Sequence, residues 1–437
     1  MTLNSKALTY ILVGIIGVGV LLTFVLILRN VSLSGGNQVT LNFLGVYDPQ
    51  SDFTKVIHDF ESQNPGVTIN YHEATYDQYE QNLVNSLAAG NAPDIFMIHN
   101  TWLPKHGDKL APMPDDIPNV ATGKDYTIQD FKSDFVDDAY SDLVYQDQVY
   151  AMPLYVDTLA LFYNKDLFNS AGITQPPRTW SEVNTDVPLL TKFDSRNNIS
   201  QAAISLGTSQ NINRSTDILM DMMIQSGTQM TDDDHRAATF DQMVGGQPVG
   251  QLALQYYTNF ANASNVDYTW NASQPYSIDA FSQGTVAMML GYAHDTQVIR
   301  SKAPRLNFAI APMPQSSLDS IQNFANYWAV AVSKNSPNQE MAWKFIQYLT
   351  SKEGATSYLN AAARPAARRD LIDLQRSDPD LGVFAIQALT AKSWFEADNN
   401  AIDTIFASMI DDVNYNRSSA ADAISHAASQ VTVLMQK

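Results

Sequence analysis

Cysteine is absent from all 437 residues of the sequence. Disulfide bonds, thiol nucleophiles, cysteine-based metal sites and a cysteine-linked lipid are therefore excluded. Basic residues are also scarce, because 26 Lys and Arg face 45 Asp and Glu, and the formal net charge is −19. Since phosphate neutralisation needs clustered Lys and Arg, we expect no nucleic-acid partner. The acidic balance favours neutral or cationic ligands over polyanions.

Recognisable catalytic and metal motifs are missing as well. The sequence has no nucleophile elbow, zinc motif or phosphate loop. The two histidines nearest each other, His99 and His106, have no zinc-ligand spacing. The acidic stretch "TDDDHR" at 231–236 lacks the Gly and the terminal Glu of a calcium loop, so it indicates a solvated loop. We expect no metal and no cofactor.

One long stretch lacks charge altogether. Residues 10–28 read "YILVGIIGVGVLLTFVLIL", and a helix of this length nearly spans the ~30 Å hydrocarbon core of a bilayer. The following "RNVSLSGGNQ" has no small-residue cleavage pattern. The sequence therefore predicts one N-terminal transmembrane helix, an uncleaved signal anchor over 1–29. A flexible tether at 30–38 would then hold the body outside the cytoplasm, although cleavage stays open.

The rest of the chain alternates strand and helix patterns. "VTLNFLGVY" and "PDIFMIH" have the pattern of strands, whereas "SDFTKVIHDFESQNP" and "TYDQYEQNLVNSLAAG" have helical apolar spacing. In the first of these helices, Phe53, Val56, Ile57 and Phe60 share one face. Such alternation predicts an α/β body with a largely parallel sheet. The length predicts two or three domains, and no single linker separates them.

Several stretches match a known family in its order. They are "NPGVTINY" with "LAAGNAPDIF", "VYAMPLYVDTLALFYNKDLFNSAGITQPPRTWSEV", "AFSQGTVAMMLGY" before "FAIAPMP", and "YWAVAVSKNSPNQEMAWKFIQYLTSKEGA". Over roughly residues 38–437 the chain resembles the maltose-binding-protein-like family 1 extracellular solute-binding proteins, the sugar-binding components of ABC importers. The resemblance implies a two-lobed α/β clamshell with interleaved lobes, the type II periplasmic-binding-protein fold. It places lobe 1 at 39–155 and 323–363, and lobe 2 at 156–322 and 364–437.

The resemblance also implies a function. The chain would cross between lobes near Tyr155–Thr158, Asn323–Tyr327 and Ala363–Ala366, and the ligand would lie in the cleft. We expect a monomeric binding protein, not an enzyme, that passes a sugar, above all a neutral oligosaccharide, to a membrane permease. A polyol or a glycerol phosphodiester is an alternative ligand. An exported carbohydrate-active enzyme, with two carboxylates across a cleft, is the alternative class.

Asp157 is the first candidate ligand contact. It stands in the apolar run "AMPLYVDTLALFY", where a carboxylate is costly unless it is paired, hydrated or facing a cleft. By resemblance it falls just past the first crossing, where relatives place a carboxylate that faces the ligand. A sugar hydroxyl donating to it would form a charge-assisted hydrogen bond. The alternative is a salt-bridged Asp at a strand end.

Further candidates follow from the chemistry of sugars, which have apolar faces and many hydroxyls. Strand ends of an α/β sheet place side chains at the ligand, and the resemblance adds others, although "GYAHD" lacks the Trp that the family's pattern would suggest. The candidates are Tyr47, Asp48, Asn100, Thr101, Trp102, Tyr155, Trp270, Tyr292, His294 and Trp394. Packing is the alternative for each aromatic. We expect Trp180, Trp343, Phe345 and Trp328 to be structural.

Overall fold

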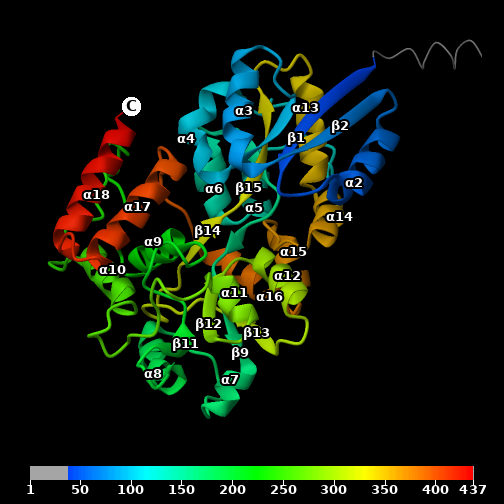
Figure 1. Ribbon diagram of the computed structural model, residues 1–437. Coiled ribbons are helices and arrows are strands. Elements are labelled where there is room, and N and C mark those ends of the chain that lie inside the picture. The colour runs from blue at the N-terminus through cyan, green and yellow to red at the C-terminus, as the bar shows by residue number, and fades with distance from the viewer. Residues whose placement is uncertain (1–37, 437) are drawn as a thin grey trace, which may run out of the picture.

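The computed structural model describes residues 38–436 and consists of two bodies, each built around a β-sheet (Figure 1). Lobe 1 contains a six-stranded sheet of order β2-β1-β3-β15-β4, with β7 paired to β15. β1 is parallel to β2 and β3, whereas β15 is antiparallel to β3, β4 and β7. Its strands are β1 (Val39–Val46), β2 (Val67–Ala74), β3 (Ile95–His99), β4 (Leu110–Ala111), β7 (Ala151–Pro153) and β15 (Trp328–Ser333).

The helices of lobe 1 bury the apolar faces that their spacing predicts. In α2 the buried residues are Phe53, Val56, Ile57 and Phe60, and the ring of Phe53 meets Phe43 of β1 edge-on at 5.2 Å. The same core holds Trp343 and Phe345, both with no exposed surface. The helices are α2 (Gln50–Gln63), α3 (Tyr76–Ala88), α4 (Leu103–His106), α5 (Ile128–Asp134), α6 (Asp137–Leu143), α13 (Gln339–Leu349), α14 (Lys352–Ala362) and α15 (Arg369–Gln375).

Lobe 2 contains a five-stranded sheet of order β10-β11-β12-β9-β13. Its strands are β9 (Ala160–Asn164), β10 (Lys192–Phe193), β11 (Ile199–Ile204), β12 (Val286–Gly291) and β13 (Phe308–Ala311). The C-terminal helices α17 and α18 lie beside α9 and α10 (Figure 1). The helices of this lobe are α7 (Lys165–Ser170), α8 (Trp180–Leu190), α9 (Ser215–Gln225), α10 (Val249–Asn259), α11 (Ser277–Ser282), α12 (Ala293–Lys302), α17 (Asn399–Asn414) and α18 (Ala420–Met435).

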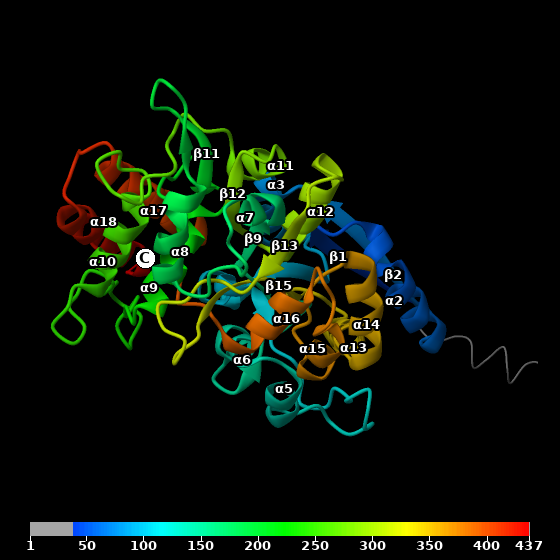
Figure 2. The same cartoon turned by 90° about the horizontal axis from the view of Figure 1, so that it is seen from below.

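Three short strands, here called the hinge strands, join the two lobes. They are β8 (Asp157–Thr158), β14 (Asn323–Asn326) and β16 (Ala391–Lys392), and they pair in the order β16-β14-β8. Helix α15 packs with α5 and α14, close to α16 (Gly382–Gln387), on the lobe 1 side of the hinge (Figure 2). Since its Leu371 and Ile372 belong to the core of lobe 1, the chain leaves that core later than the expected crossing near Ala363–Ala366.

The two sheets have separate hydrophobic cores. One core surrounds the six-stranded sheet and the other surrounds the five-stranded sheet. Trp180 begins α8 in the second core, where its Nε1 donates to Gln225 Oε1 at 2.8 Å, consistent with a structural role. Each lobe therefore has a hydrophobic core of its own.

The predicted transmembrane helix, residues 10–28 of the anchor at 1–29, lies outside the described residues. The predicted tether at 30–38 does so as well, except for its last residue. Within residues 38–436, no helix is both long enough and apolar enough to cross a bilayer.

Candidate ligand-binding cleft

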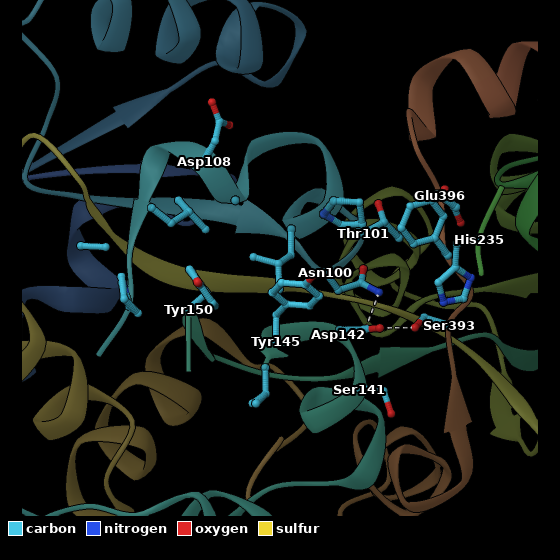
Figure 3. Close-up of a pocket in the computed structure, with 18 of the residues that line it drawn as sticks. Asn100, Thr101, Asp108, Ser141, Asp142, Tyr145, Tyr150, His235, Ser393 and Glu396 are labelled. Carbon is cyan, nitrogen blue, oxygen red and sulfur yellow. Dashed lines mark hydrogen bonds between the residues drawn. The ribbon is translucent and has the colours of Figure 1, made fainter. Parts of the chain in front are cut away.

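A cavity of about 1220 Å³ lies between the two lobes (Figure 3). Lobe 1 contributes the turn after β3, helix α6, strand β5 (Val144–Tyr145) and Tyr150, which follows β6 (Gln148–Val149) in the same hairpin. The opposite wall comes from the segment 393–396 between β16 and α17, together with His235 from the loop before α10. Both lobes therefore contribute to one site.

The base of the cavity is a hydrogen-bonded carboxylate. Asp142 of α6 accepts from Asn100 Nδ2 at 2.9 Å and from the Tyr327 hydroxyl at 2.8 Å, and the Ser393 hydroxyl donates to its other oxygen. Burial, followed by the charge of Asp138 one helical turn away, raises the pKa of Asp142 well above its usual range. Figure 3 shows Asn100, Asp142 and Ser393 joined across the gap between the lobes.

Aromatic side chains form much of the remaining wall. Trp394 is half-buried, and its Nε1 donates to Met220 Sδ at 3.2 Å. The neighbouring Phe395 stacks on His235 at 4.5 Å with nearly parallel rings. Tyr145 and Tyr150 face the cavity from the hairpin in lobe 1. Such rings offer flat apolar faces beside polar groups, as sugar rings require.

Glu396 differs from the other carboxylates of the cavity. Its side chain lines the cavity although the residue is only 4% exposed, and it accepts no hydrogen bond from residues 38–436. Burial raises the pKa of Glu396 well above its usual range; Asp403 and Asp217 add to this shift, and Arg214 opposes it. Glu396 is therefore an open acceptor in the wall.

A second polar cluster links lobe 2 to the hinge. Asp217 of α9 accepts from Arg214 Nε at 2.8 Å and from Arg214 Nη2 at 2.9 Å. It also accepts from the Tyr292 hydroxyl at 2.5 Å and from Asn326 Nδ2 at 3.3 Å. Asn326 Oδ1 in turn lies 3.3 Å from His99 Nε2 at the end of β3. Hydrogen bonds thus run from lobe 2 through β14 to lobe 1.

Three of the predicted contact residues line the cavity. Asn100 and Thr101 come from the short turn η1 (Asn100–Trp102) that follows β3, and Trp394 comes from the opposite wall. Thr101 Oγ1 lies 2.9 Å from His99 Nδ1, which fixes the turn. The end of β3 thus leads into a turn that places polar side chains at the cavity.

Two other predicted residues, Asp48 and Tyr155, contact Arg364, and a third, Tyr47, precedes Asp48 in the chain. Asp48 accepts from Arg364 Nη2 at 2.7 Å and from the Tyr358 hydroxyl at 2.6 Å. The guanidinium of Arg364 lies 4.8 Å above the ring of Tyr155. Tyr47, half exposed and left-handed at φ 68°, stacks on Tyr76 at 5.0 Å. None of the three lines the cavity described above.

Asp157 lies at the N-terminus of α12. Its two carboxylate oxygens accept from the Ala293 amide at 3.0 and 3.2 Å, and one also accepts from the Thr158 amide at 2.9 Å. Burial raises the pKa of Asp157 to about 7, against the charges of His294 and Arg364 and these amides. His294 Nε2 is 3.1 Å from Asp295 Oδ1. In this geometry Asp157 ties β8 to α12.

Two predicted tryptophans are packed instead. Trp102 is 2% exposed, stacks on Tyr79 at 6.1 Å and meets Trp328 edge-on at 5.2 Å. Its Nε1 donates to Asn399 Oδ1 of lobe 2 at 3.0 Å. Trp270 has no exposed surface in the core of lobe 2, so the geometry gives it a packing role.

Several polar residues of the cavity and of the two neighbouring polar clusters escaped the sequence reasoning: Asp142, Arg214, Asp217, His235, Arg364 and Glu396. Asp142 has the appearance of an ordinary acid on an amphipathic helix, and His235 belongs to the loop interpreted as solvated. Glu396 could have been found, because it is two residues after Trp394 in "KSWFEADNN". No group of three or more acidic or histidine side chains in residues 38–436 is arranged to hold a metal ion.

Two sheet-centred lobes, three hinge strands and a cavity between the lobes define a clamshell binding protein of the type II periplasmic-binding-protein fold. The sequence profile of the bacterial extracellular solute-binding proteins matches residues 47–356, and the chain belongs to this family. Its fold and family are thus those of substrate-binding proteins.

Similar proteins agree with this assignment. A protein of Brucella abortus (strain 2308) that is named a binding protein is 26% identical over 337 residues, which cover 76% of this chain and 77% of that protein. The sugar-binding protein MalE of Xanthomonas citri has a TM-score of 0.76 at 21% identity, covering 91% and 97% of the two chains. The cyclic alpha-maltosyl-1,6-maltose binding protein of Arthrobacter globiformis has a TM-score of 0.75 at 18% identity, covering 92% and 100%. These structures share the fold.

Proposed function

We propose that the chain captures a sugar, above all an oligosaccharide, between its two lobes. The observation that carries this proposal is the cavity between the lobes, in which aromatic faces alternate with amide, hydroxyl and carboxylate groups. Trp394 and Tyr145 can cover the apolar faces of sugar rings. Asn100, Thr101 and Glu396 can exchange hydrogen bonds with hydroxyls.

The size of the cavity supports an oligosaccharide. Its volume of about 1220 Å³ exceeds the ~300–1,000 Å³ typical of sites for drug-sized ligands. The Xanthomonas and Arthrobacter proteins, both named for binding sugars, support the same ligand class by analogy. A monosaccharide would leave part of the wall in contact with water, so we expect affinity to rise with chain length.

Transport follows as the biological role. Because a ligand that contacts both lobes favours their closed arrangement, we propose that the loaded, monomeric protein docks on an ABC permease. The body would lie outside the cytoplasm, held by a transmembrane anchor at residues 10–28. Asp157 and the residues around Arg364 lie at the hinge side of the cleft. The ligand would reach them in the open arrangement of the lobes.

Titration calorimetry of the full-length chain in mild detergent tests this proposal. We expect a saturable one-to-one signal with neutral oligosaccharides, and no change in the sugar by chromatography. Trp394→Ala should weaken binding by ~1.5–3 kcal/mol, tenfold or more, because it removes a flat apolar contact. Tyr415→Ala, which alters an exposed aromatic outside the cavity, is the matched control.

Three results would contradict the proposal. Silence across mono- and oligosaccharides would reject sugar as the ligand and favour a polyol or a glycerol phosphodiester. If chromatography found cleaved sugar after the titration, the protein would be a carbohydrate-active enzyme instead. Equal affinity for the wild type and Trp394→Ala would move the site away from this cavity.

A further inference from the structure

The wall around Glu396 contains more acidic than cationic side chains. The pKa of Glu396 responds to the nearby charges of Asp403, Asp217, Arg214 and Asp142. Arg214, the one cation of this set, already binds Asp217 through two guanidinium nitrogens at 2.8 and 2.9 Å. Asp142, Asp403 and Glu396 are therefore left without a cationic partner among these neighbours.

The other basic side chains of the cavity are exposed. Lys334 is exposed, and its Nζ donates to the backbone oxygen of Asp108 at 3.3 Å. His235 is stacked on Phe395, with Nδ1 3.0 Å from Thr231 Oγ1. Neither His235 nor Lys334 hydrogen-bonds to Glu396 or Asp142. The deep wall thus keeps its acidic excess.

Two acidic side chains in this region have unused oxygens. The side chain of Glu396 lines the cavity and accepts no hydrogen bond within residues 38–436. Asp138 Oδ2 is buried without a partner in the same part of the chain, while Asp138 Oδ1 accepts from the Ser393 amide at 2.9 Å. A buried acceptor left open is costly unless a ligand fills it.

We infer that the ligand is a sugar that carries a protonated amine, and that Glu396 binds this amine within the cavity. This inference rests on the proposed function and narrows its ligand class. A neutral hydroxyl would satisfy one lone pair but would not favour the ionised form of these acids. An ammonium group brings three donors and an opposite charge, so its hydrogen bonds to carboxylates are among the strongest in proteins.

The mutual effect of the acids supports this inference. Burial, followed by the charge of Asp217, raises the pKa of Asp403 to about 6, and burial raises that of Asp138 to about 6. A cation bound among these groups favours their ionised forms, because an opposite charge within ~4–6 Å lowers a carboxyl pKa. Binding of the amine and ionisation of the wall would therefore assist each other.

The test compares two sugars that differ at one position. D-Glucosamine carries an amine at the carbon where D-glucose carries a hydroxyl, and neither contains a glycosidic linkage. Binding to the full-length chain in mild detergent is measured by ligand-detected NMR titration at neutral pH. We expect at least tenfold tighter binding of D-glucosamine. Glu396→Gln, which keeps the shape of the side chain, should abolish that preference through a tenfold to hundredfold weaker affinity for the amine.

Asp373→Asn is the matched control. It changes the net charge by the same amount at a side chain that is 74% exposed, pairs with Arg376 and lies outside the cavity, so the preference should persist. A far-UV circular dichroism spectrum and a urea-unfolding midpoint equal to those of the wild type show that Glu396→Gln is folded.

If D-glucosamine and D-glucose bind equally, or if D-glucose binds more tightly, the inference that the ligand carries an amine is wrong, while the proposal of sugar capture stands. If neither D-glucosamine nor D-glucose binds, the inference of an amine is also wrong. The titration with oligosaccharides then tests the proposal of sugar capture separately. A preference that survives Glu396→Gln removes this residue from the site.

Discussion

At the scale of single residues, Asp157 shows how a buried acid can serve architecture. Its carboxylate accepts from the Ala293 and Thr158 amides, and the partial positive charge of the α12 N-terminus favours an anion there. Burial nevertheless raises its pKa to about 7, whereas an exposed Asp titrates near 3.9. The desolvation of this acid thus outweighs its favourable neighbours.

The sign of the resulting pH dependence follows from linkage. The folded chain holds the proton of Asp157 more tightly than the unfolded chain does. Protonation of Asp157 therefore stabilises the folded chain fully below pH ~4, and this stabilisation is lost as the pH rises through about 7. We expect Asp157→Asn, which cannot ionise, to avoid this loss. Between pH 5 and pH 8 the variant should gain about 2–4 kcal/mol on the wild type in the free energy of unfolding, measured by urea denaturation.

Burial also raises the pKa values of Asp138 and Asp403. Because the wild type and Asp157→Asn both contain these two acids, the difference between their pH profiles reports on Asp157. Parallel pH profiles for the wild type and Asp157→Asn would show that this carboxylate stays ionised in the folded chain. Asp373→Asn, at an exposed position, should leave the profile unchanged.

At the scale of elements, the start of α17 contacts α3 and α4 across the cleft. Lys105 of α4 lies 2.7 Å from Glu80 of α3 and 2.8 Å from Asp398, the N-cap of α17. Asn400 Nδ2 donates to Glu80 Oε2 at 3.2 Å. We call these four residues the latch, because α17 belongs to the core of lobe 2 and the other two helices to lobe 1.

Removal of the positive charge of Lys105 should shift the lobes towards the open arrangement. Lys105 is 27% exposed, and partly exposed ion pairs contribute only ~0.5–1 kcal/mol each. We therefore expect Lys105→Met to raise the open-to-closed ratio about two- to fivefold. Since the chain has no cysteine, Gln78→Cys and Thr404→Cys place two dyes selectively on α3 and α17. Single-molecule energy transfer between them measures the populations.

Lys55→Met provides the comparison, because Lys55 forms its ion pair within α2, with Asp59. Its populations should equal those of the wild type. If Lys105→Met leaves the transfer distribution unchanged at low salt, the latch does not hold the lobes together. A wild-type distribution that opens as salt is added would agree with a screened ionic contact.

Elements were more predictable from the sequence than long-range contacts. The face of α2 and the polar turn after β3 follow from local spacing, and these predictions agree with the structure. Trp270 has the appearance of a loop residue, yet it is fully buried, because tertiary packing covers a segment that local pattern leaves open. Glu396 and Asp142 line one cavity only because folding brings α6 near the segment after β16, which no local pattern contains.

At the scale of the whole molecule, the two cores are joined by short hinge strands and by the cleft contacts. Large two-domain chains often unfold in more than one step, so that the calorimetric enthalpy exceeds the van't Hoff enthalpy. A ligand that touches both lobes adds ~2.7 kcal/mol of stability at a hundred times its Kd. That stabilisation is lost as soon as either lobe unfolds, which couples the lobes.

We therefore expect differential scanning calorimetry to give two overlapping transitions without sugar. With saturating sugar these should merge towards one transition at higher temperature, because unfolding of either lobe must release the ligand. Trp394→Ala at the same sugar concentration should retain the two transitions, since its affinity is reduced. If sugar raised only one of the two transitions, the ligand would contact a single lobe, and the cavity between the lobes would not be its binding site.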